Sequence, residues 1–126
     1  DPLWSRGLGD VYKRQTVLGG NDGIRDTWSP YGRPDMLERA MIIGLRYNLR
    51  RDDEIEVALD TVTHSGARGC GFEAYGLGVG DRADLVLVDA QTVAHAVVER
   101  PARRLVVAGG RIVARDGVLQ DDVAAL

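Results

Sequence analysis

The sequence predicts an α/β protein in which one strand and two helices are followed by a β-rich half. Three observations support this prediction. Residues 16–20, TVLGG, are typical of the end of a buried strand that meets a glycine turn. Apolar residues recur at helical spacing in the two segments that follow. Beyond residue 75, β-branched runs alternate with glycine turns, as in strands and hairpins.

The composition favours a folded protein and argues against a nucleic-acid or membrane partner. The chain has 126 residues, 44% of them hydrophobic and 28% charged, which is enough for one modest domain with a core. Its net charge of −3 argues against a nucleic-acid or anionic-membrane surface, and no apolar run approaches the roughly 20 residues of a membrane span. The single cysteine, Cys70, excludes a disulfide framework within one chain. We therefore expect a cytoplasmic protein in which Cys70 is a small buried residue.

Residues 1–15, DPLWSRGLGDVYKRQ, fit neither a helical period nor strand alternation, and they lack a methionine start. The string resembles translated sequencing-adapter remnants at the ends of reading frames from assembled metagenomic DNA. We expect it to be non-native, with more of the parent protein encoded upstream. The alternative is an ordinary polar N-terminal arm.

A helix is predicted from Asp35, whose carboxylate can accept from the free N–H groups of the first turn. Glu38, Arg39 and Arg46 are expected on its solvated face. Its apolar positions follow three- and four-residue spacing: Leu37, Ala40, Met41, Gly44, Leu45 and Leu49.

A second helix is predicted within residues 50–71. Asp53 and Glu56 have the spacing of a capping box. Gly66 is expected to end or break this helix. The apolar stripe consists of Ile55, Ala58, Leu59 and Val62.

The β-rich half contains three further predicted elements. The run DLVLVDA, residues 84–90, is a nearly continuous apolar strand. Residues 91–100 can form a short helix that Pro101 ends. Residues 103–117 predict a hairpin whose two strands join across Gly109 and Gly110, the pair that a type I′ turn prefers.

Two motifs carry a resemblance to a known family. GVGDRADLVLVD, followed by the hairpin LVVAGGRIV, resembles the C-terminal signature of the amidohydrolase superfamily. GNDGIRDTWSPYGRPDMLERA is similar to the cytosine deaminase-like branch, in which the eighth barrel strand ends in an aspartate and a D-x-W-x-P-x-G loop follows. The resemblance covers roughly residues 17–117. It implies a C-terminal fragment: the last strand and helices of a (β/α)8 metal-dependent hydrolase barrel over residues 16–74, and strands of the accompanying β-sandwich over residues 75–126.

The resemblance also implies roles for residues of the loop. It makes Asp22 the metal-site aspartate, which takes a proton from a metal-bound water and passes it to the leaving amine. The flanking glycines Gly20 and Gly23 would let the backbone aim that side chain, although Asn-Asp-Gly is also ordinary turn chemistry. Trp28 would line the substrate pocket, with a buried packing role as the alternative. Asp26 is expected to fix the loop by accepting from backbone N–H groups.

The implied activity is hydrolysis of a C–N bond, such as deamination of a cytosine-like or other cyclic amidine or amide. The resemblance implies two consecutive aspartates (DD) at this point in the cytosine deaminase relatives, where this chain has Asp22 and Gly23. The residue after the aspartate faces the substrate in that family, so the glycine puts cytosine itself in doubt. A triazine, another cyclic amidine or an N-substituted amide would suit the same chemistry.

The implied cofactor is a divalent metal, zinc or iron, which the family binds with an H-x-H pair and two later histidines. The chain has only His64 and His95, at neither of the expected places, and both are expected to be structural or surface residues. One acidic ligand does not hold a catalytic metal. The isolated chain is therefore expected to be inactive, with the rest of the barrel encoded upstream.

Two rival interpretations remain. A nucleotide-binding domain could cradle phosphate with GGNDG, but the chain lacks both G-x-G-x-x-G and the P-loop Lys-Ser/Thr pair. Alternatively, the chain is a non-catalytic, β-rich interaction module with amidohydrolase ancestry. Such a module would fold cooperatively by itself and bind a specific partner without metal.

Overall fold

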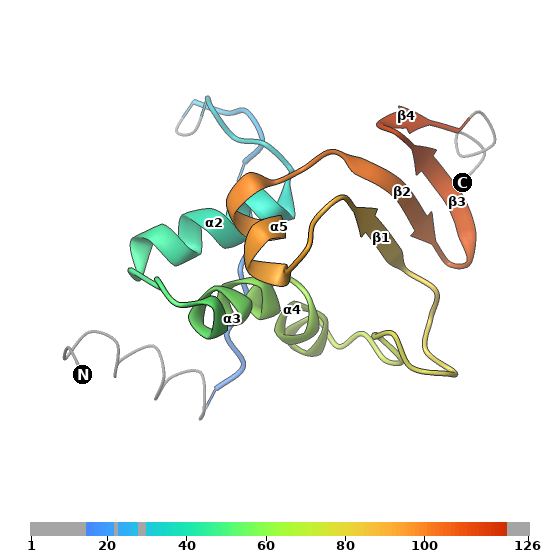
Figure 1. Cartoon of the computed structure of the whole chain (residues 1–126), viewed down its shortest axis with the longest axis horizontal. Helices are drawn as coiled ribbons and strands as arrows, with labels where there is room; N and C mark the ends of the chain where they lie inside the picture. The colour runs from blue at the N-terminus through green and yellow to red at the C-terminus, as the bar shows by residue number, and fades with distance from the viewer. Residues whose placement is uncertain (1–14, 22, 28–29, 121–126) are drawn as a thin grey trace.

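The computed structural model describes residues 15–120, except residues 22, 28 and 29. A group of four helices lies beside a four-stranded antiparallel sheet (Figure 1). The described chain is thus α/β, as predicted. None of the helices in this described part is long and apolar enough to span a membrane.

Helix α2, Met36–Arg46, begins where it was predicted. The Asp35 carboxylate accepts hydrogen bonds from the backbone N–H groups of Leu37 (3.0 Å) and Glu38 (3.2 Å). Ala40 and Gly44 are buried, and Gly44 faces Ala58 of the next helix. This confirms the core of the predicted stripe.

Two assignments on α2 are wrong. Leu45 is 73% exposed, because it lies beside the face that packs on the next helix. Arg39, expected in solvent, is half-buried, and its Nε has no hydrogen-bond partner. The long aliphatic part of an arginine side chain can cover apolar surface, so classing the residue as polar does not predict that it is exposed.

Helix α3, Asp52–Val62, has Arg51 at its N-cap position, two residues before the predicted cap Asp53. The capping carboxylate is that of Glu54, which accepts from the N–H groups of Arg50 (2.8 Å) and Arg51 (3.1 Å). The expected Asp53–Glu56 box is therefore wrong. Three consecutive acids stand in the first turn, and the helix uses the one that reaches back to the N–H groups before it.

The break after α3 falls at Thr63, and Gly66 lies inside the short helix α4, His64–Gly69. The hydroxyl groups of Thr61 and Thr63 donate to the carbonyls of Ala58 (2.7 Å) and Leu59 (2.9 Å). Such bonds compete with the backbone of a helix and explain a break at threonine instead of glycine. Cys70, expected to be buried, is exposed because it follows the end of α4.

The sheet has the order β1-β2-β3-β4, with all neighbours antiparallel. Its strands are β1, Leu85–Val88; β2, Arg103–Ala108; β3, Arg111–Arg115; and β4, Val118–Leu119. Gly109 and Gly110 join β2 to β3 with φ of 55° and 80°, as the hairpin prediction requires. The two-residue strand β4 was not predicted, because it is too short for a recognisable pattern.

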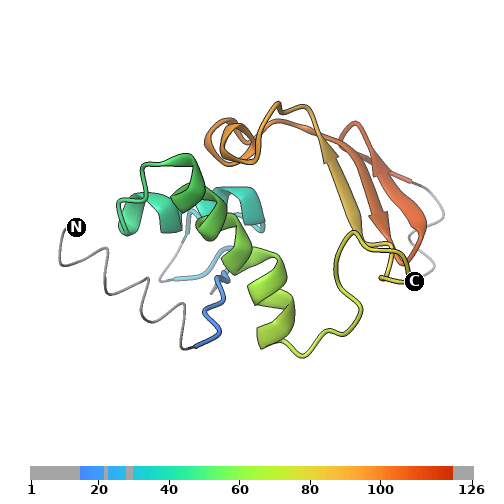
Figure 2. The same cartoon turned by 60° about the horizontal axis from the view of Figure 1, so that its bottom comes forward.

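Helix α5, Val93–Glu99, was predicted and lies between β1 and β2 in the chain. The Thr92 hydroxyl accepts from the His95 N–H (3.0 Å), and Arg100 ends the helix at a φ of 50°. α5 packs against α2 and α3, away from the sheet (Figures 1 and 2). Its buried residues are Ala94, Ala96 and Val97.

Residues 16–20 belong to no strand of the described structure, contrary to the prediction. A strand needs a neighbouring backbone with which to pair. The segment instead lies against the helices: the Gly19 N–H donates to the Thr61 carbonyl (2.9 Å). A Cβ on Gly19 would also overlap Ile43 of α2.

Candidate functional site

The loop between residues 20 and 35 is the segment to which the sequence assigns the chemistry. Asp22 and Trp28 lie outside the described residues, so the metal and substrate roles expected of them remain predictions. The described part of the loop shows how its two ends are held.

The two limbs of the loop pass close to one another. The side-chain Nδ2 of Asn21 donates to the backbone carbonyl of Arg33, twelve residues later. A Cβ on Gly32 would overlap the carbonyl oxygens of Gly23 and Ile24. Backbone cannot yield as a flexible side chain can, so this crossing point requires glycine.

Gly23 and Asp26 share one space within the loop. The carboxylate of Asp26 occupies the position that a side chain on residue 23 would enter. Gly23 stands where the DD pattern has its second aspartate. Its lack of a side chain leaves room for the Asp26 carboxylate.

The end of the loop is fixed by Asp35. Besides capping α2, the Asp35 carboxylate forms an ion pair with Arg103 of β2, 68 residues away in sequence. The two side chains are 19% and 25% exposed, so solvent screens this pair only partly. The sequence predicted the cap, but no local pattern points from Asp35 to Arg103.

A hollow of about 260 Å³ adjoins the start of the loop. Residues 17–20 line one side of it, and Arg39, Ile43 and Thr61 line the other. Among the described residues, two buried side-chain atoms lack hydrogen-bond partners, Arg39 Nε and Asn21 Oδ1. An unpaired buried polar atom costs about 1–3 kcal/mol. The start of the loop is therefore a region where polar groups remain unsatisfied.

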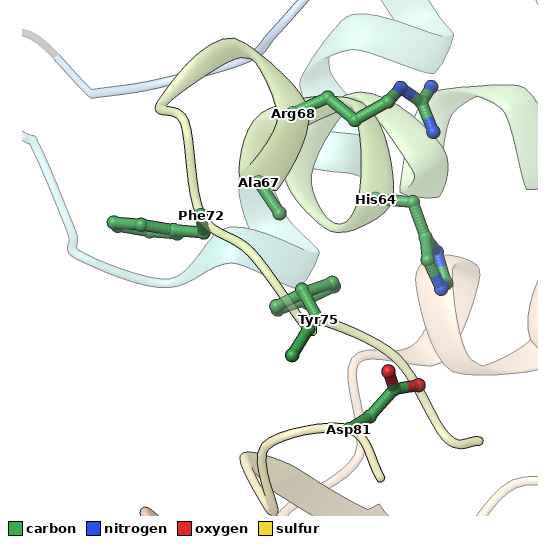
Figure 3. Close-up of a pocket in the computed structure, with 7 residues that line it drawn as sticks. His64, Ala67, Arg68, Phe72, Tyr75 and Asp81 are labelled. Carbon is green, nitrogen blue, oxygen red and sulfur yellow. The ribbon is translucent and has the colours of Figure 1, made fainter. Parts of the chain in front are cut away.

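A second, open hollow of about 330 Å³ lies beside α4 (Figure 3). His64 and Tyr75 meet edge to face there, with ring centroids 5.5 Å apart. Partial burial, and secondarily the negative charge of Asp84, raise the pKa of Tyr75 above its usual value. Asp60 lies 3.8 Å from His64 Nδ1 and 3.7 Å from the Arg68 guanidinium. These contacts join α3, α4 and the following loop.

The histidines do not form a metal centre in the described structure. His64 is 54% exposed at its side chain, and His95 Nδ1 accepts from the N–H of Gln91 (3.1 Å) at the start of α5. Across residues 15–120 with the stated gaps, no group of three or more His, Cys, Asp or Glu side chains could hold a metal ion. The described residues do not, by themselves, fit the cation that the resemblance implies.

The amidohydrolase family profile matches residues 11–114, most of the chain. The chain belongs to the amidohydrolase family. It is 35% identical over 100 residues to the N-isopropylammelide isopropyl amidohydrolase of Pseudomonas sp. (strain ADP), a match that covers 79% of this chain and 25% of that protein.

Solved amidohydrolase structures agree with this assignment. N-isopropylammelide isopropylaminohydrolase from Burkholderia multivorans ATCC 17616 matches 90% of this chain and 29% of its own, with 65% identity and a TM-score of 0.86. The 5-methylcytosine deaminase of Klebsiella pneumoniae, solved with phosphonocytosine, shares the fold at 24% identity, with a TM-score of 0.77 over 93% of this chain and 28% of its own. This amidohydrolase chain therefore spans between a quarter and a third of the length of the relatives it matches.

Proposed function

We propose that the chain is the C-terminal part of a metal-dependent amidohydrolase that hydrolyses the C–N bond between an N-heterocycle and an exocyclic alkylamino group. N-isopropylammelide, a triazine, is the proposed substrate. The observation that carries the proposal is the 65% identity to the Burkholderia enzyme that is named for this compound. At that identity, two proteins of the same fold have most of their residue contacts in common.

The proposed architecture completes the described one. Residues 16–74 would supply the last strand and helices of the barrel, and residues 75–126 would supply strands of the β-sandwich. In this arrangement, residues 16–20 would pair with barrel strands encoded upstream.

The proposed reaction replaces an amine by an oxygen. A water oxygen adds to the ring carbon, the water proton goes to the exocyclic nitrogen, and the C–N bond breaks to release the alkylamine. Asp22 is the proposed carrier of that proton, because it follows residues 16–20, the proposed last barrel strand, and catalytic residues of such barrels occur at strand ends. Trp28 would contact the ring.

The proposed cation is zinc or iron, which acidifies the attacking water when bound in such enzymes. Since the described residues do not form a metal centre, its histidine ligands would come from the upstream barrel, and Asp22 would be the ligand from this chain. The 126-residue chain alone would bind no cation tightly and would be inactive.

Gly23 and Asp26 support a substrate other than cytosine. The Asp26 carboxylate occupies the space of the missing side chain at residue 23. The polar surface beside Asp22 would therefore differ from that of a relative with two consecutive aspartates. This difference supports a substrate other than cytosine.

The test is to recover the reading frame upstream of residue 16 and to express the complete enzyme. We expect it to release isopropylamine from N-isopropylammelide, and to deaminate cytosine far more slowly. Asp22→Asn should lower kcat by a factor of 10² or more, on the order of the loss of a general base. Asp116→Asn, which changes an exposed carboxylate in the turn between β3 and β4, is the matched control. Amine release that survives Asp22→Asn, or an enzyme that prefers cytosine, would contradict the proposal.

A further inference from the structure

The loop that carries Asp22 and Trp28 is tied at its base. Asn21, directly before Asp22, holds the carbonyl of Arg33 at the far limb. Pro34 and Asp35 then lead into α2, and the Asp35 carboxylate accepts from the first N–H groups of that helix. Any shift of Asp35 would therefore move the far limb of the loop and, through Asn21, the near limb as well.

Arg103 is built to hold Asp35 in place. One terminal nitrogen of its guanidinium binds the Asp35 carboxylate, and the other donates to the carbonyl of Pro101 (3.2 Å). Both members of the ion pair are largely shielded from solvent, with side chains 25% and 19% exposed. The neighbouring pair on the same strand, Arg104 with Asp116, has side chains 58% and 60% exposed. Two adjacent arginines thus differ sharply in their surroundings.

The same carboxylate oxygen serves both contacts. Oδ1 of Asp35 accepts from Leu37 and Glu38 of α2 and binds Arg103 of β2. The ion pair therefore fixes the cap, and not merely the surface of the helix. Arg103 is the first residue of β2 and pairs with Val88 of β1, so the ion pair ties the cap of α2 to the start of the sheet.

We propose that Arg103 is a positioning residue for catalysis: through Asp35 it anchors to the sheet the loop that carries Asp22 and Trp28. This inference rests on the proposed function. It gives the small sheet a part in the reaction, although no residue of the sheet needs to contact the substrate.

The first test compares two neighbouring arginines in the complete enzyme. Arg103→Gln should lower kcat on the order of tenfold at an unchanged KM, as losses of supporting contacts do. Arg104→Gln is the matched control and should leave kcat unchanged. Arg103→Lys keeps the charge and should recover most of the activity. All variants are assayed well below their unfolding midpoints, so that an unfolded fraction does not lower kcat.

A second variant removes the same contact from the other side. Asp35→Ser retains a good helix cap but is too short to reach Arg103. We expect it to reproduce the kcat of Arg103→Gln, and we expect the double variant to be no slower than either single one. Additive losses, or a full kcat in Arg103→Gln, would overturn the inference.

Hydrogen exchange separates this inference from the proposed function. Amides of residues 23–33 should exchange faster in Arg103→Gln than in the wild type or in Arg104→Gln. If the wild type fails to hydrolyse N-isopropylammelide but the exchange rates change as expected, the proposed substrate is wrong and the anchor stands. If the exchange rates are equal in all three proteins, the anchor is wrong, whatever the enzyme hydrolyses.

Discussion

At the scale of single residues, Asp84 shows why the two halves of the amidohydrolase signature occur together. One of its carboxylate oxygens accepts from the Gly109 N–H (2.6 Å) at the tip of the β2–β3 hairpin, and the other binds Arg82 (2.8 Å). The Gly110 N–H donates to the carbonyl of Ala83 (2.9 Å). The ADLV segment at the start of β1 and the glycine pair of the hairpin turn are thus joined by direct hydrogen bonds; we call this contact the joint.

The first prediction concerns that joint. Asp84→Ala should lower the free energy of unfolding by about 1–2 kcal/mol, because it removes the hydrogen bond of an ionised carboxylate to the Gly109 N–H together with the ion pair to Arg82. Asp116→Ala, which removes an exposed partner of Arg104, should cost no more than about 1 kcal/mol. Urea denaturation followed by circular dichroism measures both. Equal losses in the two variants would show that the Asp84 contact adds nothing specific.

Single-residue contacts were predictable only where they are local. Asp35 was predicted as a cap because the acceptor and the donors lie within three residues of each other. Its second partner, Arg103, lies in a different element. The residues that flank Asp35 and Arg103 in the sequence do not indicate that contact. The half-buried state of Arg39 has the same origin: it depends on residues 17–20, which the helical pattern does not include.

At the scale of elements, the start of α3 depends on one carboxylate. Backbone hydrogen bonds from Arg50 and Arg51 hold the pKa of Glu54 below its usual value. Such a lowered pKa means that folding favours the ionised form. The resulting stabilisation is present above the pKa of the unfolded chain and is lost as the pH falls through the lower, folded value.

The second prediction follows from this sign. Glu54→Gln should be less stable than the wild type at pH 7, and the difference should shrink as the pH falls through the lowered pKa of the folded wild-type carboxylate. Glu56→Gln changes an exposed acid of the same helix and should show a much smaller difference. Unfolding midpoints measured between pH 3 and pH 7 test both variants. A Glu54→Gln difference that stays constant with pH would count against the carboxylate cap.

Elements with self-contained patterns were predicted well. The hairpin across Gly109 and Gly110 and the helix that ends before Pro101 each carry their own start and stop signals. The segment 16–20 was not predicted well, because a strand forms only beside a neighbouring strand. Its predicted neighbours are not among the described residues. In the candidate site, the roles of Asp22 and Trp28 remain predictions. The contacts of Asn21 and Asp35 at the two ends of the loop were found only in the structure.

At the scale of the whole molecule, much apolar surface is exposed. In β1, Val86 and Leu87 are 57% and 60% exposed, and in the edge strand β4 the two residues Val118 and Leu119 are 66% and 63% exposed. β1 and β4 are the two edges of the sheet, and exposed apolar side chains on sheet edges favour association.

The third prediction is that the 126-residue chain by itself associates through this sheet. Val86→Thr should shift sedimentation toward the monomer, because it replaces an apolar side chain by a polar one with the same branched shape. Val79→Thr is the matched control, since Val79 is fully exposed in a loop and belongs to no apolar surface of the sheet. If both variants sediment like the parent chain, the sheet is not the associating surface.

The placement of α5 has a consequence for how such a protein is inherited. The chain passes from the helices to β1, returns to the helices as α5, and crosses again to β2. A gene segment that encodes the sheet alone would have to omit a helix encoded in its middle. Recombination would therefore transmit the helices and the sheet together, as a single evolutionary unit.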